Sequence, residues 1–183
     1  RNHILLYPKK TIEQKILSSF YWVSNVRIQV AGKDSIVVRL KEREPKALWC
    51  DGQMTEEKCY FLDSHGFIFT PAPSFSSDVY IRYSGKVSGE SLGNFFLPER
   101  FTKVTAFVDL VKERDLEPLT VAIDEYGDGV VTLKNGQILF DTNDDLSVSF
   151  QNLDSFLREN EKEFMKKPFE YIDLRFGNKI FYK

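Results

Sequence analysis

The sequence is short of the residues and patterns on which most enzymes and membrane-spanning helices depend. It has two histidines and two cysteines in 183 residues, and the glycine-rich signatures of P-loops, dinucleotide sites and GxSxG hydrolases are missing. No stretch approaches the ~20 apolar residues that a membrane helix needs, and no signal peptide opens the chain. These absences favour a binding module without catalytic residues, cofactor or metal.

The composition is that of an ordinary globular protein, but the charge is unevenly distributed. At 42% hydrophobic and 14% aromatic residues, the chain can bury a sizeable core in one domain or two small ones. Residues 1–50 carry ten Lys/Arg against four Asp/Glu, a net +6, which leaves −8 for residues 51–183. The asymmetry predicts two units with different surroundings. The basic unit suits either an anionic membrane surface or a merely solvated hairpin, and its charge is too sparse to predict nucleic-acid binding.

The first unit has the pattern of a helix followed by a β-hairpin. Residues 11–20 combine a capping box with apolar residues on one helical face. Apolar and polar residues then alternate over 26–30 and 36–40, on either side of a turn that contains Gly32. The polar face of this hairpin is expected to point to solvent, and it carries Arg27, Gln29, Arg39 and Lys41.

Pro45 marks the place where the chain leaves the first unit, because proline cannot donate a ladder hydrogen bond. We therefore expect a boundary that separates residues 1–48 from residues 49–183. In the second unit, the patterns predict strands over 59–63, 67–69, 79–83, 120–124, 129–134, 137–141, 169–176 and 179–183, and helices over 98–112 and 149–166. Asn135-Gly136 predicts a tight hairpin. The fold class is α+β, with a mixed or antiparallel sheet and two packed helices.

The two cysteines are spaced for a bond across a hairpin. Cys50 ends one strand and Cys59 begins the next, so a hairpin would bring their β-carbons within bridging range. A disulfide over so short a loop adds roughly 2 to 3 kcal/mol, and such bonds belong in oxidising compartments. The alternative is two reduced thiols at strand ends. Without further ligands at suitable spacing, the pair does not make a metal site.

Three polar clusters offer chemistry at first sight, but turn formation explains each of them. Residues 63–65 read Asp-Ser-His, and adjacent residues of a tight turn point apart, whereas Ser-His-Asp catalysis needs them convergent. The acidic run 141–145 lacks the glycine and the glutamate of a calcium loop, and it predicts an aspartate-capped turn into a helix. Asp124, Glu125 and Asp128 fall at a predicted hairpin tip.

The C-terminus ends on aromatic strand-like segments. Residues 171–176 and 179–183 flank Gly177-Asn178, and nothing after them caps a sheet edge. An edge strand with apolar and aromatic side chains pairs with a partner or aggregates unless it is protected. From the residues alone, partner binding and simple completion of the sheet both remain open.

Taken together, these segments resemble the extracytoplasmic part of the FtsQ/DivIB family of bacterial cell-division proteins. WVSNVRIQV and SIVVRLKEREPKALW resemble the end of the family's POTRA module, and CYFLDSHGFIF resembles the opening of its β domain. VTLKNGQILFD is similar to a family hairpin, except that Asp141 replaces the usual glycine, and YIDLRFGNKIFYK resembles the terminal strand. Two departures stand out: the first strand and helix of the module have no counterpart before Arg1, and the Cys50/Cys59 pair is not a general family feature.

The resemblance implies a partial POTRA domain over residues 1–48 and a β domain over residues 49–183. It also implies a single-pass membrane protein of the division septum, whose transmembrane helix precedes Arg1 and whose present region is extracytoplasmic. The implied role is a non-enzymatic scaffold that binds FtsB/DivIC-like and FtsL-like subunits by strand addition and helps control septal peptidoglycan synthesis. The implied partner-binding residues are Arg175, Phe176, Lys179, Ile180, Phe181 and Tyr182.

Two alternatives belong to other classes of protein. The first is another POTRA-containing binding module, of protein translocation or outer-membrane assembly, against which the mixed β region after Trp49 counts. The second is a small secreted hydrolase. It would need a histidine and a carboxylate that converge in a pocket, and His3 and His65 both lie in peripheral segments.

Overall fold

A computed structural model describes residues 7–32, 35–52, 58–74, 79–160 and 168–183, so His3 lies outside the described residues. The described elements are α1 (Lys9–Ser19), β1 (Val23–Ala31), β2 (Ser35–Glu42), β3 (Ala47–Asp51), β4 (Lys58–Leu62), β5 (Ile68–Pro71), β6 (Arg82–Gly85), α2 (Phe101–Lys112), β7 (Pro118–Ile123), β8 (Asp128–Leu133), β9 (Gly136–Asp141), α3 (Leu146–Glu159), β10 (Ile172–Phe176) and β11 (Lys179–Tyr182). The fold is α+β, as the sequence patterns predict.

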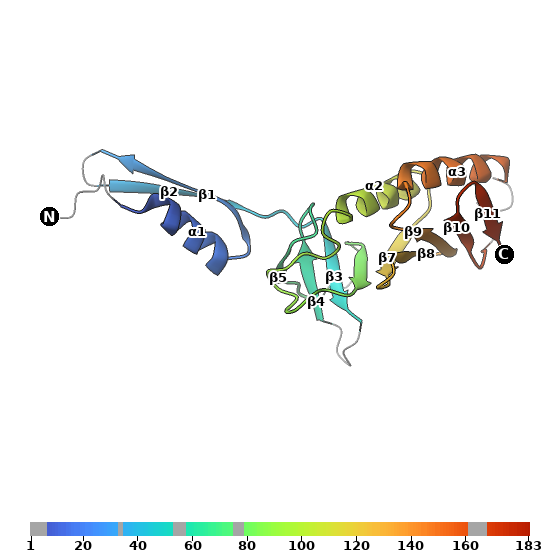
Figure 1. The fold of residues 1–183 in the computed structure, drawn as a ribbon, viewed down its shortest axis with the longest axis horizontal. Coiled ribbons are helices and arrows are strands. Elements are labelled where there is room, and N and C mark those ends of the chain that lie inside the picture. The colour runs from blue at the N-terminus through green and yellow to red at the C-terminus, as the bar shows by residue number, and fades with distance from the viewer. Residues whose placement is uncertain (1–6, 33–34, 53–57, 75–78, 161–167) are drawn as a thin grey trace.

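The N-terminal lobe is the expected helix and hairpin, and it has a small core of its own. The predicted capping box is wrong, because the helix begins at Lys9 after Pro8 and no side chain caps it. β1 and β2 pair only with each other, in antiparallel register. Val23, Val26 and Ile28 of β1 are buried against α1, and the Glu13 carboxylate accepts a hydrogen bond from the Ile28 backbone N–H at 3.0 Å. In Figure 1 this lobe lies at one end of an elongated molecule.

The apolar residues of β2 are not buried as the alternating pattern suggests. Ile36, Val38 and Leu40 lie opposite Val30, Ile28 and Val26, yet they remain 42 to 49% exposed. The helix packs along β1, so its side chains do not reach across to β2. A strip of apolar side chains is therefore uncovered beside the small core.

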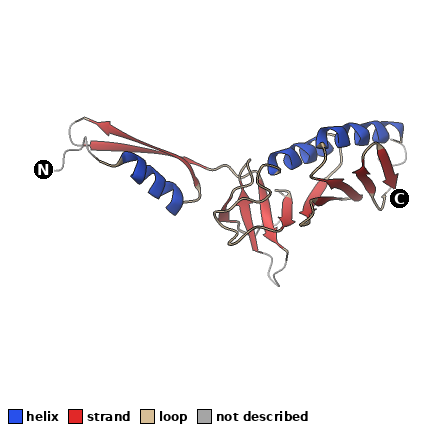
Figure 2. Ribbon diagram, viewed as in Figure 1, coloured by secondary structure: helices blue, strands red, loops and turns tan. Residues whose placement is uncertain are grey.

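The second sheet holds nine strands in the order β11-β10-β9-β8-β7-β6-β3-β4-β5. It is mixed, because β3 runs parallel to β6, β6 to β7 and β9 to β10, while the other neighbours are antiparallel. Both α2 and α3 lie along the same face of its C-terminal half (Figures 1 and 2). That face carries the large core, which includes Tyr83, Phe101, Phe107, Phe140 and Leu153.

Four predicted boundaries in this unit are wrong by three residues, and one of them is the start of the strand expected from residue 169, which is β10 and begins at Ile172. The strand expected over 79–83 is β6, at 82–85, where its register is set by the parallel neighbours β3 and β7. Pro98 lies in a turn ahead of α2, between Leu97 and Glu99, both of which have positive φ angles. The helix expected from residue 149 begins at Leu146, because the Asp145 side chain caps it. Residues 161–166 of that prediction lie outside the described residues.

The hairpin expected at Asn135-Gly136 is present, but its glycine has a different role. Leu133 pairs with Gly136, so Lys134 and Asn135 form the turn and Gly136 already belongs to β9. A β-carbon on Gly136 would lie 2.5 Å from the ring of Phe169, whose backbone N–H donates to the Asn135 carbonyl. The glycine is required by the close approach of the segment that leads into β10.

The two lobes meet at Arg43. Its Nε donates to the Tyr21 carbonyl at 2.9 Å, its Nη1 pairs with Asp63 Oδ2 at 2.5 Å, and its guanidinium carbon lies 4.1 Å from the centroid of the Phe67 ring. The Tyr21 ring covers Gly93 so closely that any β-carbon there would lie 2.5 Å away. A cation, a carboxylate and two aromatic rings thus join the lobes.

Candidate functional site

The two edges of the large sheet differ in how they are protected. β5 is a short edge strand whose outer side is occupied, because the Ile68 N–H donates to the Asn94 carbonyl and the Gly93 N–H donates to the Ile68 carbonyl. At the other edge, β11 pairs with β10 alone among the described strands. The C-terminal strand, which the sequence left undecided, is therefore a sheet edge.

The register of the last hairpin fixes which backbone groups point outward. Lys183 and Tyr171 exchange both backbone hydrogen bonds, at 3.1 and 3.3 Å. Inward and outward groups alternate along an antiparallel strand, so Phe181, opposite Asp173, faces β10 and Ile180 directs its N–H and C=O away from it. A partner strand at this edge would meet the backbone of Ile180.

Aromatic side chains flank the edge on both faces of the sheet. On the helix-free face, the rings of Phe176 and Phe181 stand 5.0 Å apart and are 54% and 50% exposed. On the helix face, the Tyr182 ring lies 5.0 Å from Phe156 of α3, and Ile180 packs against the large core. Exposed aromatic pairs beside an open strand are the features of a partner-binding edge.

Arg175 is held by two carboxylates on the helix-free face. Its guanidinium pairs with both oxygens of Asp173, at 2.9 and 2.7 Å, and with Asp128 of β8 at 2.9 Å. Burial pushes the pKa of Asp173 upward, but the hydrogen bonds and charge of Arg175 outweigh it and hold that pKa below its usual value. The network fixes the position of β10 against β8 across the intervening strand.

The six residues implied by the resemblance all lie on this last hairpin, with Arg175 and Phe176 on β10 and the remainder on β11. Sequence reasoning missed Phe156, which contacts Tyr182, and Asp173, which holds Arg175. It assigned Asp128 to a hairpin tip, whereas the structure pairs this residue with Arg175. The only local signal was Asp173, which shares a strand face with Arg175. A hollow of about 480 Å³ opens beside the edge, lined by Gln137, Leu139, Tyr171, Arg175, Phe176 and Phe181 among others.

The cysteines lie where the hairpin prediction places them. Cys50 of β3 is directly opposite Cys59 of β4, and their sulfurs are at bonding distance, 2.06 Å. Cys50 is buried and Cys59 is half-buried. The bond joins β3 to β4, two strands that lie in the half of the sheet remote from β11.

The polar clusters form turns, as predicted, except that Asp128 is not a turn residue: it begins β8 and pairs with Arg175. Asp63 Oδ1 accepts from the backbone of His65 and Phe67, and Asp124 Oδ1 accepts from three backbone N–H groups of its own turn. His65 is exposed, and its ring contacts Ser64 at 3.2 Å. Within the described ranges, no group of three His, Cys, Asp or Glu residues is arranged to hold a metal ion.

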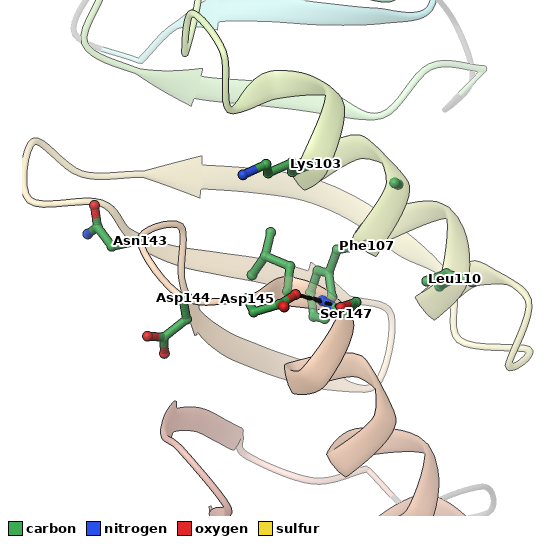
Figure 3. Close-up of a pocket in the computed structure, with 9 residues that line it drawn as sticks. Lys103, Phe107, Leu110, Asn143, Asp144, Asp145 and Ser147 are labelled. Carbon is green, nitrogen blue, oxygen red and sulfur yellow. Dashed lines mark hydrogen bonds between the residues drawn. The ribbon is translucent and has the colours of Figure 1, made fainter.

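A second hollow, of about 560 Å³, lies between α2 and the turn that leads into α3 (Figure 3). The Asp145 carboxylate accepts from the Ser147 N–H and hydroxyl there, and these hydrogen bonds lower its pKa. Lys103 of α2 lines the opposite wall. Asp145 therefore serves as the cap of α3, in line with the sequence prediction.

Comparison with known proteins does not identify a relative. A scan against protein-family models found no match, and a search among curated proteins found none either. In the described part of the chain, none of the helices is long and apolar enough to cross a bilayer. A functional proposal therefore rests on the residues of the site and on the resemblance of the sequence.

Proposed function

We propose that the protein is a non-enzymatic, extracytoplasmic scaffold of the bacterial division complex, of the FtsQ/DivIB type, anchored in the cell membrane at the septum. Its partners are FtsB/DivIC-like and FtsL-like subunits, and its role is to help control septal peptidoglycan synthesis. The observation that carries the proposal is the difference between the two sheet edges. The edge that the resemblance assigns to partner binding is the uncovered one, while the opposite edge is blocked.

Binding occurs by addition of a partner strand to β11. Backbone hydrogen bonds to outward-facing groups such as those of Ile180 set the register, and side chains at alternate positions supply specificity. Phe176 and Phe181 serve as anchors on the helix-free face, while Tyr182 and Phe156 serve on the other. Arg175, fixed by its two carboxylates, holds the strand that carries Phe176 in a single position.

The test is a calorimetric titration of this chain with a synthetic peptide from the membrane-distal end of the FtsB-like subunit of the same organism. We expect micromolar or tighter binding. Phe176→Glu places a charge among the exposed rings and should weaken binding at least about 30-fold, the loss typical of an interface hot spot.

Tyr126→Glu is the matched control, because Tyr126 is a still more exposed aromatic residue, at 78%, on the β7–β8 turn. It should leave the affinity unchanged. Equal losses in both variants would show that the terminal hairpin is not the contact. Failure of the unmodified chain to bind, with Cys50–Cys59 intact, would point to a partner of another POTRA-type system.

A further inference from the structure

The sheet face of the N-terminal lobe that turns away from α1 is basic. Val26 and Ile28 point toward α1, so the alternating residues Asn25, Arg27 and Gln29 point to the other side. Their partners on β2 share that side: Lys41 is opposite Asn25 and Arg39 is opposite Arg27. We call the surface formed by Arg27, Arg39 and Lys41 the basic face, and all three residues are exposed.

The basic face breaks a local rule of sheet stability. Arg27 and Arg39 are directly opposite each other, and like charges in that relation destabilise a hairpin. Arg39 donates to Gln29, but within the part of the chain that the structure describes no carboxylate forms an ion pair with any of the three cations. Arg43, Arg114 and Arg175 of the same chain are each paired with an aspartate. Cations that are left opposed at a cost to folding indicate an external anion.

The shape of the basic face indicates what that anion is. Arg27 and Arg39 lie opposite each other on the two-stranded sheet and line neither of the hollows described above, whereas Lys41 lines a further hollow of about 460 Å³ with Glu42, Glu44 and Asp63. The two opposed arginines therefore suit an extended array of negative charges better than a single bound ion. The charge of the molecule is also separated along its length, with +6 in the first 50 residues and −8 in the remainder. The lobe that carries the positive charge lies at one end (Figure 1).

We infer that the basic face binds the surface of an anionic phospholipid bilayer. Such a surface attracts the N-terminal lobe and repels the acidic C-terminal unit. The protein would therefore stand with its N-terminal lobe on the bilayer and its C-terminal unit pointing away from it. The inference does not depend on strand addition, because β11 is at the opposite end of the chain and of the molecule. Each cation near an anionic membrane contributes about a fivefold gain in affinity, and salt weakens the effect.

The test is co-sedimentation of the whole chain with phosphatidylcholine vesicles that contain or lack phosphatidylglycerol, at low and at physiological salt. We expect sedimentation only with phosphatidylglycerol, decreasing as salt rises. The variant Arg27→Gln/Arg39→Gln/Lys41→Gln should lower the vesicle affinity roughly 100-fold. The matched control, Lys9→Gln/Lys10→Gln/Lys15→Gln, removes the same charge from α1 and should retain most of the binding.

A single substitution separates binding from folding. Arg27→Glu places a carboxylate opposite Arg39, so it should raise the midpoint of unfolding of the lobe and at the same time weaken vesicle binding. Weaker binding in a more stable protein is not the result of misfolding.

Three results would overturn the inference. One is no sedimentation of the unmodified chain at low salt. Another is an equal loss in the α1 control, which would assign any attraction to the charge of the lobe as a whole. The third is binding to soluble polyglutamate without binding to vesicles, which would make the face a site for an acidic protein segment.

Discussion

At the scale of single residues, Asp173 offers a stability test that depends on pH. Arg175 holds the folded-state pKa of Asp173 below its usual value of about 4, so the ionised pair stabilises the fold at neutral pH. That contribution is present above the unfolded-state pKa and is lost as the pH falls through the folded-state value. We expect the urea midpoint to fall as the pH drops below about 4, and Asp173→Asn to remove part of this fall. An identical acid response in the variant would contradict the assignment.

Residue chemistry was the part of the site that sequence reasoning described best. Turn roles for Asp63, Asp124 and Asp145 follow from side-chain oxygens that reach backbone groups two to four residues away, so a local pattern is sufficient. The Arg175–Asp128 pair spans 47 residues. No local sequence pattern predicts this ion pair, because it forms only when β8 and β10 lie in the same sheet.

At the scale of elements, Gly136 lets the segment that leads into β10 pack closely against β9. A β-carbon at this position would meet the ring and carbonyl of Phe169 at 2.5 and 2.6 Å. We expect Gly136→Ala to lower the free energy of unfolding by about 1 to 3 kcal/mol, the usual cost of overpacking. Denaturant titration provides the measurement. Gly52→Ala is the control, since nothing lies within 4 Å of its added carbon, and equal effects would remove Phe169 from the explanation.

The existence of most elements could be predicted, but their arrangement could not. Periodicity located α1, the β1–β2 hairpin and the strands that hold Cys50 and Cys59. The position of β6 between β3 and β7 depends on parallel pairings such as Leu48 with Arg82, which are far apart in the chain. The exposure of Ile36, Val38 and Leu40 has a similar cause: alternation predicts which residues share a face, while packing against α1 decides whether that face is buried.

At the scale of the whole molecule, Arg43 joins the two lobes, and we expect its contacts to set their relative orientation. Arg43→Met would leave the largely buried Asp63 carboxylate without its cation, at a cost of about 1 to 3 kcal/mol. We expect small-angle X-ray scattering of this variant to give a broader distribution of interatomic distances. Lys46→Met is the control, because it removes only an exposed pair with Asp109. Unchanged scattering from the Arg43 variant would show that other contacts set the orientation.

The blocked outer side of β5 also limits how far the large sheet can grow. A sheet that accepts strands at both edges can extend from copy to copy into an open fibre. Here the Gly93–Asn94 segment already occupies one end. If strand addition occurs at β11 as proposed, this chain would offer one position for it, to be taken by a single partner chain or by a second copy joined edge to edge. The large sheet would then end an assembly at a stoichiometry of one partner per chain.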